Sequence, residues 1–532
     1  MTMNRRQFGQ LIGLGATGAA LARVPATFAQ DGSIVRMGMN TSDIGTLDPH
    51  FASGTQDRAT VDMIFNGLVR FVPGVSDEFE ADLAEAIPEG VVNDDGSQTW
   101  TFTLKEGVMT HAIEGVDAVE LTVEDLLFSF EKAANPETSA YAGDYAGWSF
   151  AIGEGDREFQ ITLDLPVSPT LFLPKVSNYS GGYVIPQAPF ETVGAESFNT
   201  KPVGTGPFAF SQHNAQLDVQ LVAHPEFFRG APQLAGVHVV FQADPTAREL
   251  ALQSGDLEVI YGLPEAAWVE RMNAEDNLIG DVFGVGEVGF VNLNVEDEIL
   301  SDPLVREAIV LAINPDNHVA LAGEPVGQRV YSVVPAHLMP GGLDEAQATE
   351  AGVYFEQNIE RAQELLAEAG YPDGFEMDLI SSEMESYRAR YEVLQEELRQ
   401  IGITVNLEVV QHATMHELIR EGRNPLTVYV AFRPSADTYL TQFFATDGGV
   451  TNFSNFTVDD LRDQARAETD AEVQAELWRQ ANIEIYQNFA GYALAINNLV
   501  YVRNNGVDYG HELNAVPQLY PGINENTTFG ES

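Results

Sequence analysis

Alternating apolar and polar residues mark two strands in the stretch 199–261. Each run places three apolar residues at every second position: Leu217, Val219 and Leu221, then Val237, Val239 and Phe241. This two-residue period predicts two half-buried strands. A helix is predicted next, because Asp244 can cap its first turn and Pro245 has the φ angle that the first helical position requires. We expect this helix to end at Gly255 and a strand to follow over 257–261.

A second clear pattern lies further along the chain. Apolar residues recur at helical spacing over 358–369 and 387–401, and a glycine follows each of these segments. Residues 375–379 and 403–409 alternate as strands do. Consecutive strands joined by a helix predict a parallel or mixed sheet with right-handed crossovers.

The rest of the chain also combines the two-residue period of strands with the apolar spacing of helices. Strands are predicted over 34–38, 100–104, 159–165, 288–294 and 494–502, and helices around 61–65 and over 302–313, 458–467 and 471–488. The pattern therefore predicts an α/β protein, and 532 residues suffice for more than one domain.

The charge of the chain excludes whole classes of partner. Its formal net charge is −52, with 79 acidic residues against 27 basic ones. Such a chain cannot neutralise the phosphates of a nucleic acid or bind an anionic membrane surface. We expect the acidic residues to form a solvated surface that keeps the protein soluble at high salt.

The first 29 residues have the pattern of an export signal. Arg5 and Arg6 precede an apolar run that ends near Ala22, and small residues at Thr27 and Ala29 suit cleavage. This segment resembles a twin-arginine signal, and a general secretory signal with two arginines is the alternative. The chain has no cysteine, so we expect no disulfide, no thiol nucleophile and no lipid anchor. A periplasmic protein is predicted.

Several motifs occur in a characteristic order. PVGTGPF at 202–208 precedes a strand, HPEFFRG at 224–230 precedes the next, and DPTARELALQSGDLEVI follows at 244–260. Leu-Asp-Pro at 47–49 lies upstream of all three. This set resembles the peptide and nickel class of solute-binding proteins, family 5, which serve ABC transporters. The resemblance implies a two-lobed α/β fold like the type II periplasmic binding proteins, of the large three-domain class, with mixed sheets and a hinge.

The resemblance also implies how the chain is divided after the signal at 1–29. The main domain of lobe 1 is expected to combine 30–66, 199–286 and 487–532. Its accessory domain is expected over 67–198, and lobe 2 over 287–486. The chain would then cross twice between the lobes and form the hinge there.

Residues at the ligand cleft are expected by the same resemblance: Gly45, Thr46, Leu47, Tyr429, Phe432, Arg433 and Asp437. In peptide-binding members of the class, an aspartate of the cleft loop pairs with the free amino group of the ligand. That position falls here on Phe432 or Arg433, and a guanidinium binds a carboxylate or phosphate rather than an ammonium group. Asp437 serves an amine if the loop is shifted, and Arg433 could instead pair with a surface acid.

Catalytic and metal sites have little support in the sequence. Ser129 and Lys132 satisfy the Ser-x-x-Lys pattern of the penicillin-recognising enzymes. They lie in a predicted amphipathic helix, however, and the Ser-Asp-Asn and Lys-Thr-Gly motifs that accompany the pattern in those enzymes are missing. His412 and His416 have the spacing of two metal ligands on a helix, yet no third ligand is apparent, so we expect an exposed pair. We therefore predict no catalytic residue, no metal and no cofactor.

The function implied by the resemblance is solute capture for an ABC importer. A monomer would bind a small peptide or a peptide-like or anionic solute between its lobes and deliver it to the transmembrane permease subunits. An exported hydrolase or amidase is the alternative from another class, and it would need a nucleophile and base that the motifs do not supply. A periplasmic sensor or chaperone would share the fold and differ in its partner.

Overall fold

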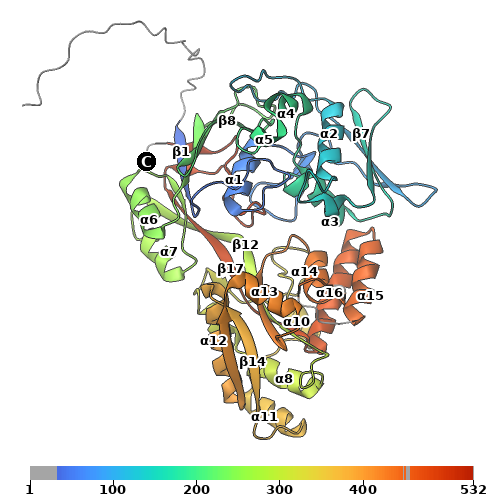
Figure 1. The fold of residues 1–532 in the computed structure, drawn as a ribbon, viewed down its shortest axis with the longest axis vertical. Helices are drawn as coiled ribbons and strands as arrows, with labels where there is room; N and C mark the ends of the chain where they lie inside the picture. Colours follow the sequence, from blue (N-terminus) through green and yellow to red (C-terminus); the bar gives the residue numbers. More distant parts are fainter. Residues whose placement is uncertain (1–32, 447, 451–455, 531–532) are drawn as a thin grey trace, which may run out of the picture.

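The computed structural model describes residues 33–446, 448–450 and 456–530. The export signal predicted over 1–29 lies outside the described residues. Figure 1 shows two lobes joined by long strands. Lobe 1 denotes the part with helices α1–α7, and lobe 2 denotes the part with helices α8–α16.

A mixed sheet of nine strands connects the lobes. In spatial order its strands are β16 (Leu426–Ala431), β12 (Leu278–Leu293), β17 (Gly491–Asn504), β11 (Val259–Tyr261), β1 (Ile34–Met39), β10 (Gly236–Phe241), β9 (Asp218–Ala223) and β8 (Phe208–Asn214), with β13 (Gly327–Gln328) beside β17. The central strand β1 is parallel to β10 and β11, and the other pairs are antiparallel. Valine, isoleucine and phenylalanine dominate these strands because they pack well on a pleated surface.

Strands β12 and β17 form the hinge. They have 16 and 14 residues, and they pair antiparallel from Leu278 with Asn504 to Asn292 with Gly491. Figure 1 shows this ribbon running from one lobe into the other. The register shifts between Phe283 and Glu287, as at a β-bulge, which locally bends and twists a strand.

Lobe 1 contains the first part of the chain. Its helices are α1 (Thr55–Ile64), α2 (Val123–Ala133), α3 (Pro169–Phe172), α4 (Gln187–Val193), α5 (Ala195–Phe198), α6 (Pro245–Ser254) and α7 (Ala266–Asn273). A separate sheet has the order β4 (Val91–Val92), β5 (Gln98–Thr103), β7 (Glu158–Leu163) and β6 (Trp148–Ile152), and β2 (Val69–Phe71) pairs with β3 (Phe79–Ala81). Trp100 stacks on Phe172 with ring centroids 4.0 Å apart, which joins this sheet to α3.

Lobe 2 contains most of the later helices. They are α8 (Pro303–Ala312), α9 (Pro315–Val319), α10 (Glu345–Glu350), α11 (Ile359–Glu368), α12 (Glu385–Gln400), α13 (His412–Arg420), α14 (Ala436–Phe443), α15 (Phe456–Ala467) and α16 (Ala471–Gln487). Helix α12 connects the strands β14 (Phe375–Ser382) and β15 (Ile403–Val410), which pair in parallel. This confirms the predicted βαβ unit.

The short strands β18 (Val507–Asp508) and β19 (Thr528–Phe529) pair near the C-terminus, beyond β17.

The structure corrects several details of the predicted strands. Leu165 was expected at the end of a strand, but β7 ends at Leu163 and Leu165 is 75% exposed. Leu217 is 58% exposed because it lies in the turn before β9. The strand predicted over 288–294 is only the second half of β12, whose glycine-rich first half has no clear alternation.

Candidate functional site

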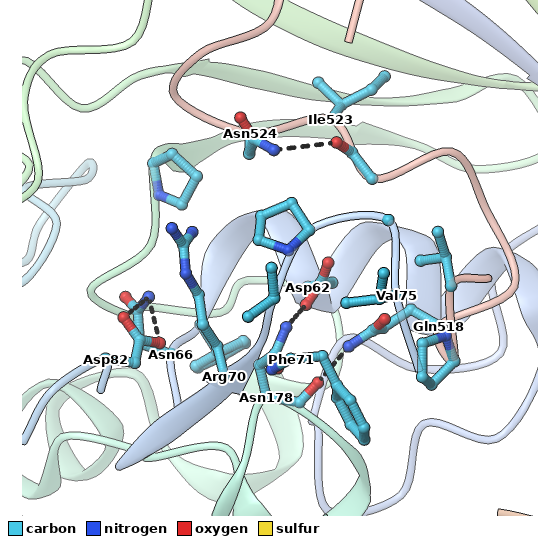
Figure 2. A pocket seen from close by; sticks show the side chains of 18 of the residues that line it. Asp62, Asn66, Arg70, Phe71, Val75, Asp82, Asn178, Gln518, Ile523 and Asn524 are labelled. Atoms are coloured by element: carbon cyan, nitrogen blue, oxygen red, sulfur yellow. Dashed lines mark hydrogen bonds between the residues drawn. The ribbon is translucent and has the colours of Figure 1, made fainter. Parts of the chain in front are cut away.

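A small pocket lies inside lobe 1. Its volume is about 50 Å³, which has room for water but not for a solute. Figure 2 shows hydrogen bonds from Asn178 to Asp62 and from Asn66 to Asp82 on its wall. Asp62 also accepts a hydrogen bond of 2.9 Å from the Tyr520 hydroxyl. The hydrogen bond from Tyr520 thus holds the C-terminal segment against α1. Because of its small volume, the pocket is not a solute site.

The large cavity lies between the lobes. Its volume is about 1000 Å³, which is enough for a small-molecule ligand. Lobe 1 lines it with residues that include Arg58, Tyr141, Asp144, Trp148, Leu165, Lys175 and Tyr179. Lobe 2 lines it with residues that include Arg433, Asp437, Thr441, Gln442, Asp463 and Arg466. In Figure 1, α3 faces α14 and α15 across this cleft.

The wall from lobe 1 combines aromatic rings with two cations. The Arg58 guanidinium lies 5.2 Å from the centroid of the Tyr179 ring, and the Lys175 ammonium lies 5.6 Å from that of Trp148. Lys175 also donates a hydrogen bond of 2.9 Å to the Asp144 carbonyl oxygen. Burial lowers the pKa of Lys175, with the charge of Asp144 opposing this effect.

The wall from lobe 2 contains a paired acid. Asp437 accepts two hydrogen bonds from Arg466, of 2.7 and 3.0 Å, in a bidentate ion pair. Ser435 caps α14 and thereby fixes the position of Asp437 in its first turn. The carboxylate is therefore already neutralised in this conformation, and an amine would have to compete with Arg466.

Arg433 has only neutral hydrogen-bond acceptors. It donates to the Phe432 carbonyl oxygen at 2.8 Å and to the Gln442 side chain, and it stacks 4.9 Å from the Phe443 ring centroid. Within the described part of the chain, no carboxylate lies within ion-pairing distance of it. Burial lowers its pKa. These contacts hold the guanidinium in place while its charge remains available to an anion.

The other predicted site residues lie outside the cleft lining. The Gly45 N–H donates to Asp57 at 2.8 Å, and the Thr46 hydroxyl donates to Asn199 at 2.9 Å. Leu47 is fully buried in the core of lobe 1. Tyr429 is buried in β16, and Phe432 is partly buried beside Arg433. The structure thus brings Arg433 and Asp437 together at the cleft and leaves Gly45, Thr46 and Leu47 in lobe 1.

The sequence prediction missed the cations of lobe 1 and the aromatic rings under them. Arg58 lies on α1, whereas Lys175 lies in a short 3-10 helix, Leu173–Val176, more than a hundred residues further on, and Tyr179 follows that helix. Only folding brings these segments together. The sequence held one indication of Lys175, namely the rarity of lysine: the chain contains only four.

The Ser-x-x-Lys pattern proves to be structural. The Ser129 hydroxyl is buried, accepts a hydrogen bond of 2.9 Å from the Ile185 N–H and donates to the Tyr183 carbonyl oxygen. Lys132 forms a buried ion pair of 2.9 Å with Asp48. Each group has its own partners, so they do not form a nucleophile and base.

The histidine pair is half-buried rather than exposed, which corrects the prediction. His412 and His416 approach each other to 3.1 Å between their Nε2 atoms, and Tyr429 lies 3.0 Å from His416 Nδ1. Burial, followed by the charge of His412, lowers the pKa of His416 to about 4. Among the described residues there is no group of three or more potential ligands of His, Cys, Asp or Glu type that could hold a metal ion.

None of the described helices is long and apolar enough to cross a membrane.

Two lobes, a hinge of long strands and a cleft between them define a periplasmic binding protein fold. The sequence model of the bacterial extracellular solute-binding proteins, family 5, matches residues 78–450, and the chain belongs to this family. The predicted family and the predicted two-lobed α/β fold are thereby confirmed.

Individual relatives bind different solutes. The chain is 25% identical over 461 residues to heme-binding protein A of Haemophilus influenzae, covering 81% of each chain. It is 23% identical over 482 residues to the dipeptide-binding protein of Escherichia coli K12, covering 84% of this chain and 86% of that one. The solved structure of MoaA from A. tumefaciens R10, in complex with mannopinic acid, has 34% identity, a TM-score of 0.73 and coverage of 94% and 100%.

Proposed function

We propose that this protein captures a small peptide-like or anionic solute between its lobes and delivers it to the permease of an ABC importer. The observation that carries the proposal is Arg433, a half-buried cation without a carboxylate partner at ion-pairing distance in the described chain, on the wall of a cleft of about 1000 Å³. A guanidinium in such a place binds a carboxylate or phosphate with charge-assisted hydrogen bonds.

The relatives support a solute with an acidic group. One of them is named a dipeptide-binding protein, and MoaA was solved with mannopinic acid. Carboxylic acids are common to both kinds of ligand. Another relative is named for heme. The arginine at the cleft favours an acidic group on the solute of this protein, whatever the size of that solute.

Capture would proceed by closure of the hinge. Arg433 and Arg466 belong to lobe 2, whereas Arg58 and Lys175 belong to lobe 1. A solute can touch both sets only when the lobes are together, so binding shifts the population towards the closed form by the difference in affinity. The permease would then recognise the closed form.

Further parts of the proposal concern the organisation and location of the protein. Lobe 1 would combine 30–66, 199–286 and 487–532, with the accessory domain over 67–198 and lobe 2 over 287–486. The protein would be an exported periplasmic monomer without a lipid anchor. Such a protein would act by binding and not by catalysis.

Native mass spectrometry tests the proposal. The protein is purified from its export compartment without added ligand and is compared before and after denaturation and refolding. We expect an additional mass that denaturation removes and that carries an acidic group. A preparation that never retains a small molecule, and that no acid, peptide or amino-acid derivative stabilises against heat, would contradict solute capture.

A further inference from the structure

The lining of the cleft carries more cations than acids, unlike the protein as a whole. The chain has a formal net charge of −52. The charged residues of the lining are the cations Arg58, Lys175, Arg433 and Arg466 and the acids Asp144, Asp437 and Asp463. A positive lining inside so acidic a protein attracts anions into the cleft and repels cations.

Ion pairs consume most of the acids of the lining. Arg466 holds Asp437 through the two hydrogen bonds described above. Asp463 lies 2.9 Å from the guanidinium of Arg462, which is not part of the lining. Among the described residues of the lining, Asp144 is then the one remaining acid against three cations. These unpaired groups have a net charge of +2, which matches two singly charged acidic groups on a solute.

The two cations of lobe 1 are held by neutral partners. Arg58 is half-buried and its guanidinium lies against the Tyr179 ring, 5.2 Å from the centroid. Lys175 is half-buried too, and its ammonium donates to the backbone carbonyl oxygen of Asp144. In the described parts of the chain, no carboxylate lies within ion-pairing distance of either cation. Rings and carbonyl groups orient both side chains without neutralising their charge.

The backbone beside these cations is strained. Ser180 lines the cleft directly after Tyr179, and its φ angle is 51°. A residue other than glycine adopts this left-handed conformation only at a cost, which the surrounding structure has to offset. Such strain is typical of ligand-binding sites. Its location, next to the ring under Arg58, supports a binding role for this wall.

The unpaired cations lie on opposite walls of the cleft. The 3-10 helix with Lys175 follows α3 directly, and α3 faces α14 and α15 in Figure 1. Arg433 lies just before α14 in lobe 2. A solute with two separate acids can engage both walls at once, and it then stabilises the closed form relative to the open one.

We infer that Arg58 and Lys175 form a second anion subsite in the cleft, so that the solute carries two separate acidic groups, one held by Arg433 and one by lobe 1. This inference rests on the proposed function and adds the second acid and the wall that holds it. A solute with a neutral amide in place of the second acid leaves the cations of lobe 1 unmatched. The cleft therefore selects a diacid over its monoamide.

The experiment uses matched probes that differ only in the second acid. Mannopinic acid has two carboxylates and is compared with its side-chain carboxamide, which has one. The dipeptides Met-Glu and Met-Gln form the second pair and differ in the same way. Isothermal calorimetry on the full mature protein should show that the better diacid binds about tenfold to hundredfold more tightly than its amide, since one charge-assisted bond is at stake.

Variants of lobe 1 assign this preference to the subsite. At least one of Arg58→Gln and Lys175→Gln should lower the ratio of the two affinities by about tenfold, whereas Lys175→Arg keeps the charge and should keep the preference. Lys201→Gln is the matched control. The Lys201 ammonium also donates to a backbone carbonyl oxygen, that of Glu114 at 2.7 Å, but it lies outside the cleft lining, so the wild-type ratio should remain.

The outcomes distinguish the two proposals. Equal binding of diacid and amide by the wild type, an unchanged ratio in both glutamine variants of the subsite, or binding of neither pair would overturn the second subsite. A solute with a single acidic group, found by native mass spectrometry, would overturn it as well. In all of these cases the capture of an acid still stands if the protein retains an acidic solute. If no solute is retained and none stabilises the protein, solute capture itself fails.

Discussion

One buried hydrogen bond joins the two lobes beside the cleft. The Ser168 hydroxyl donates to Gln474 Oε1 at 2.6 Å, and both side chains are fully buried. Ser168 also caps α3 of lobe 1 by accepting from the Leu171 N–H. Gln474 lies on α16 of lobe 2, and its Nε2 donates to the Ala465 carbonyl oxygen at 2.6 Å. Each of the two side chains is thus also held by a hydrogen bond within its own lobe.

Ser168→Ala should favour separation of the lobes. With the lobes together, Gln474 Oε1 would remain buried without a donor, which costs about 1–3 kcal/mol. Water supplies a donor once the lobes separate, so this cost applies to the closed form alone. The ratio of closed to open protein should therefore fall by about fivefold to 150-fold.

Pulsed electron resonance can measure this ratio directly. The chain has no cysteine, so Glu137→Cys in lobe 1 and Glu472→Cys in lobe 2 give two unique, exposed labelling sites. Ser168→Ala should add a population with a longer distance between the labels.

Loss of a helix cap alone must be separated from loss of the bond between the lobes. Asp244→Ala is the control, because Asp244 caps α6 by accepting from the Ala247 N–H and lies outside the cleft lining. It should lower thermal stability without changing the distance between labels. An identical distance distribution in wild type and Ser168→Ala would refute the reasoning.

Three further predictions concern stability and chemistry. Burial lowers the pKa of His111 to about 3, so the unfolded chain binds a proton that the native protein does not, and stability falls as the pH drops below about 6.5. Urea titrations of His111→Gln should show about 2 kcal/mol less loss between about pH 7.5 and about pH 5 than the wild type, and equal losses would contradict the assignment. Glu525→Ala removes a buried partner of Arg229, at 2.8 Å, and should lower the free energy of unfolding by about 3 kcal/mol; a change below about 1 kcal/mol would argue against an anchoring role. Wild type should not hydrolyse a peptide or ester library, and turnover that Ser129→Ala abolishes would favour the enzyme alternative.

Local patterns in the sequence determine most of the elements. The helix from Pro245 is capped by Asp244 and ends at Gly255 in the left-handed conformation, as the sequence predicts. Such signals act within a few residues, so they can be identified without knowledge of the fold. The order of the motifs indicates the family, and the family in turn implies the two lobes.

The cleft depends on contacts that no local pattern contains. Leu165 continues the alternation of a strand, yet it lies on the cavity wall because the strand ends before it. Arg433 was predicted from a loop that resembles the cleft loop of the family, whereas Arg58 and Lys175 have no motif around them. Their place on the cleft wall depends on which segments fold against them, and this is a property of tertiary structure.

Calorimetry on Arg433 variants tests the central claim most directly. The titrant is the acidic solute identified by native mass spectrometry, with mannopinic acid as the second probe. Arg433→Ala should weaken binding by about tenfold to hundredfold, since a charge-assisted hydrogen bond contributes about 1.5–3 kcal/mol, and Arg433→Asp should weaken it further. Arg361→Ala, at a half-buried position of α11 outside the cleft lining, should bind as the wild type does. Unchanged affinity in both Arg433 variants, with folding intact, would contradict the claim that this arginine holds the solute.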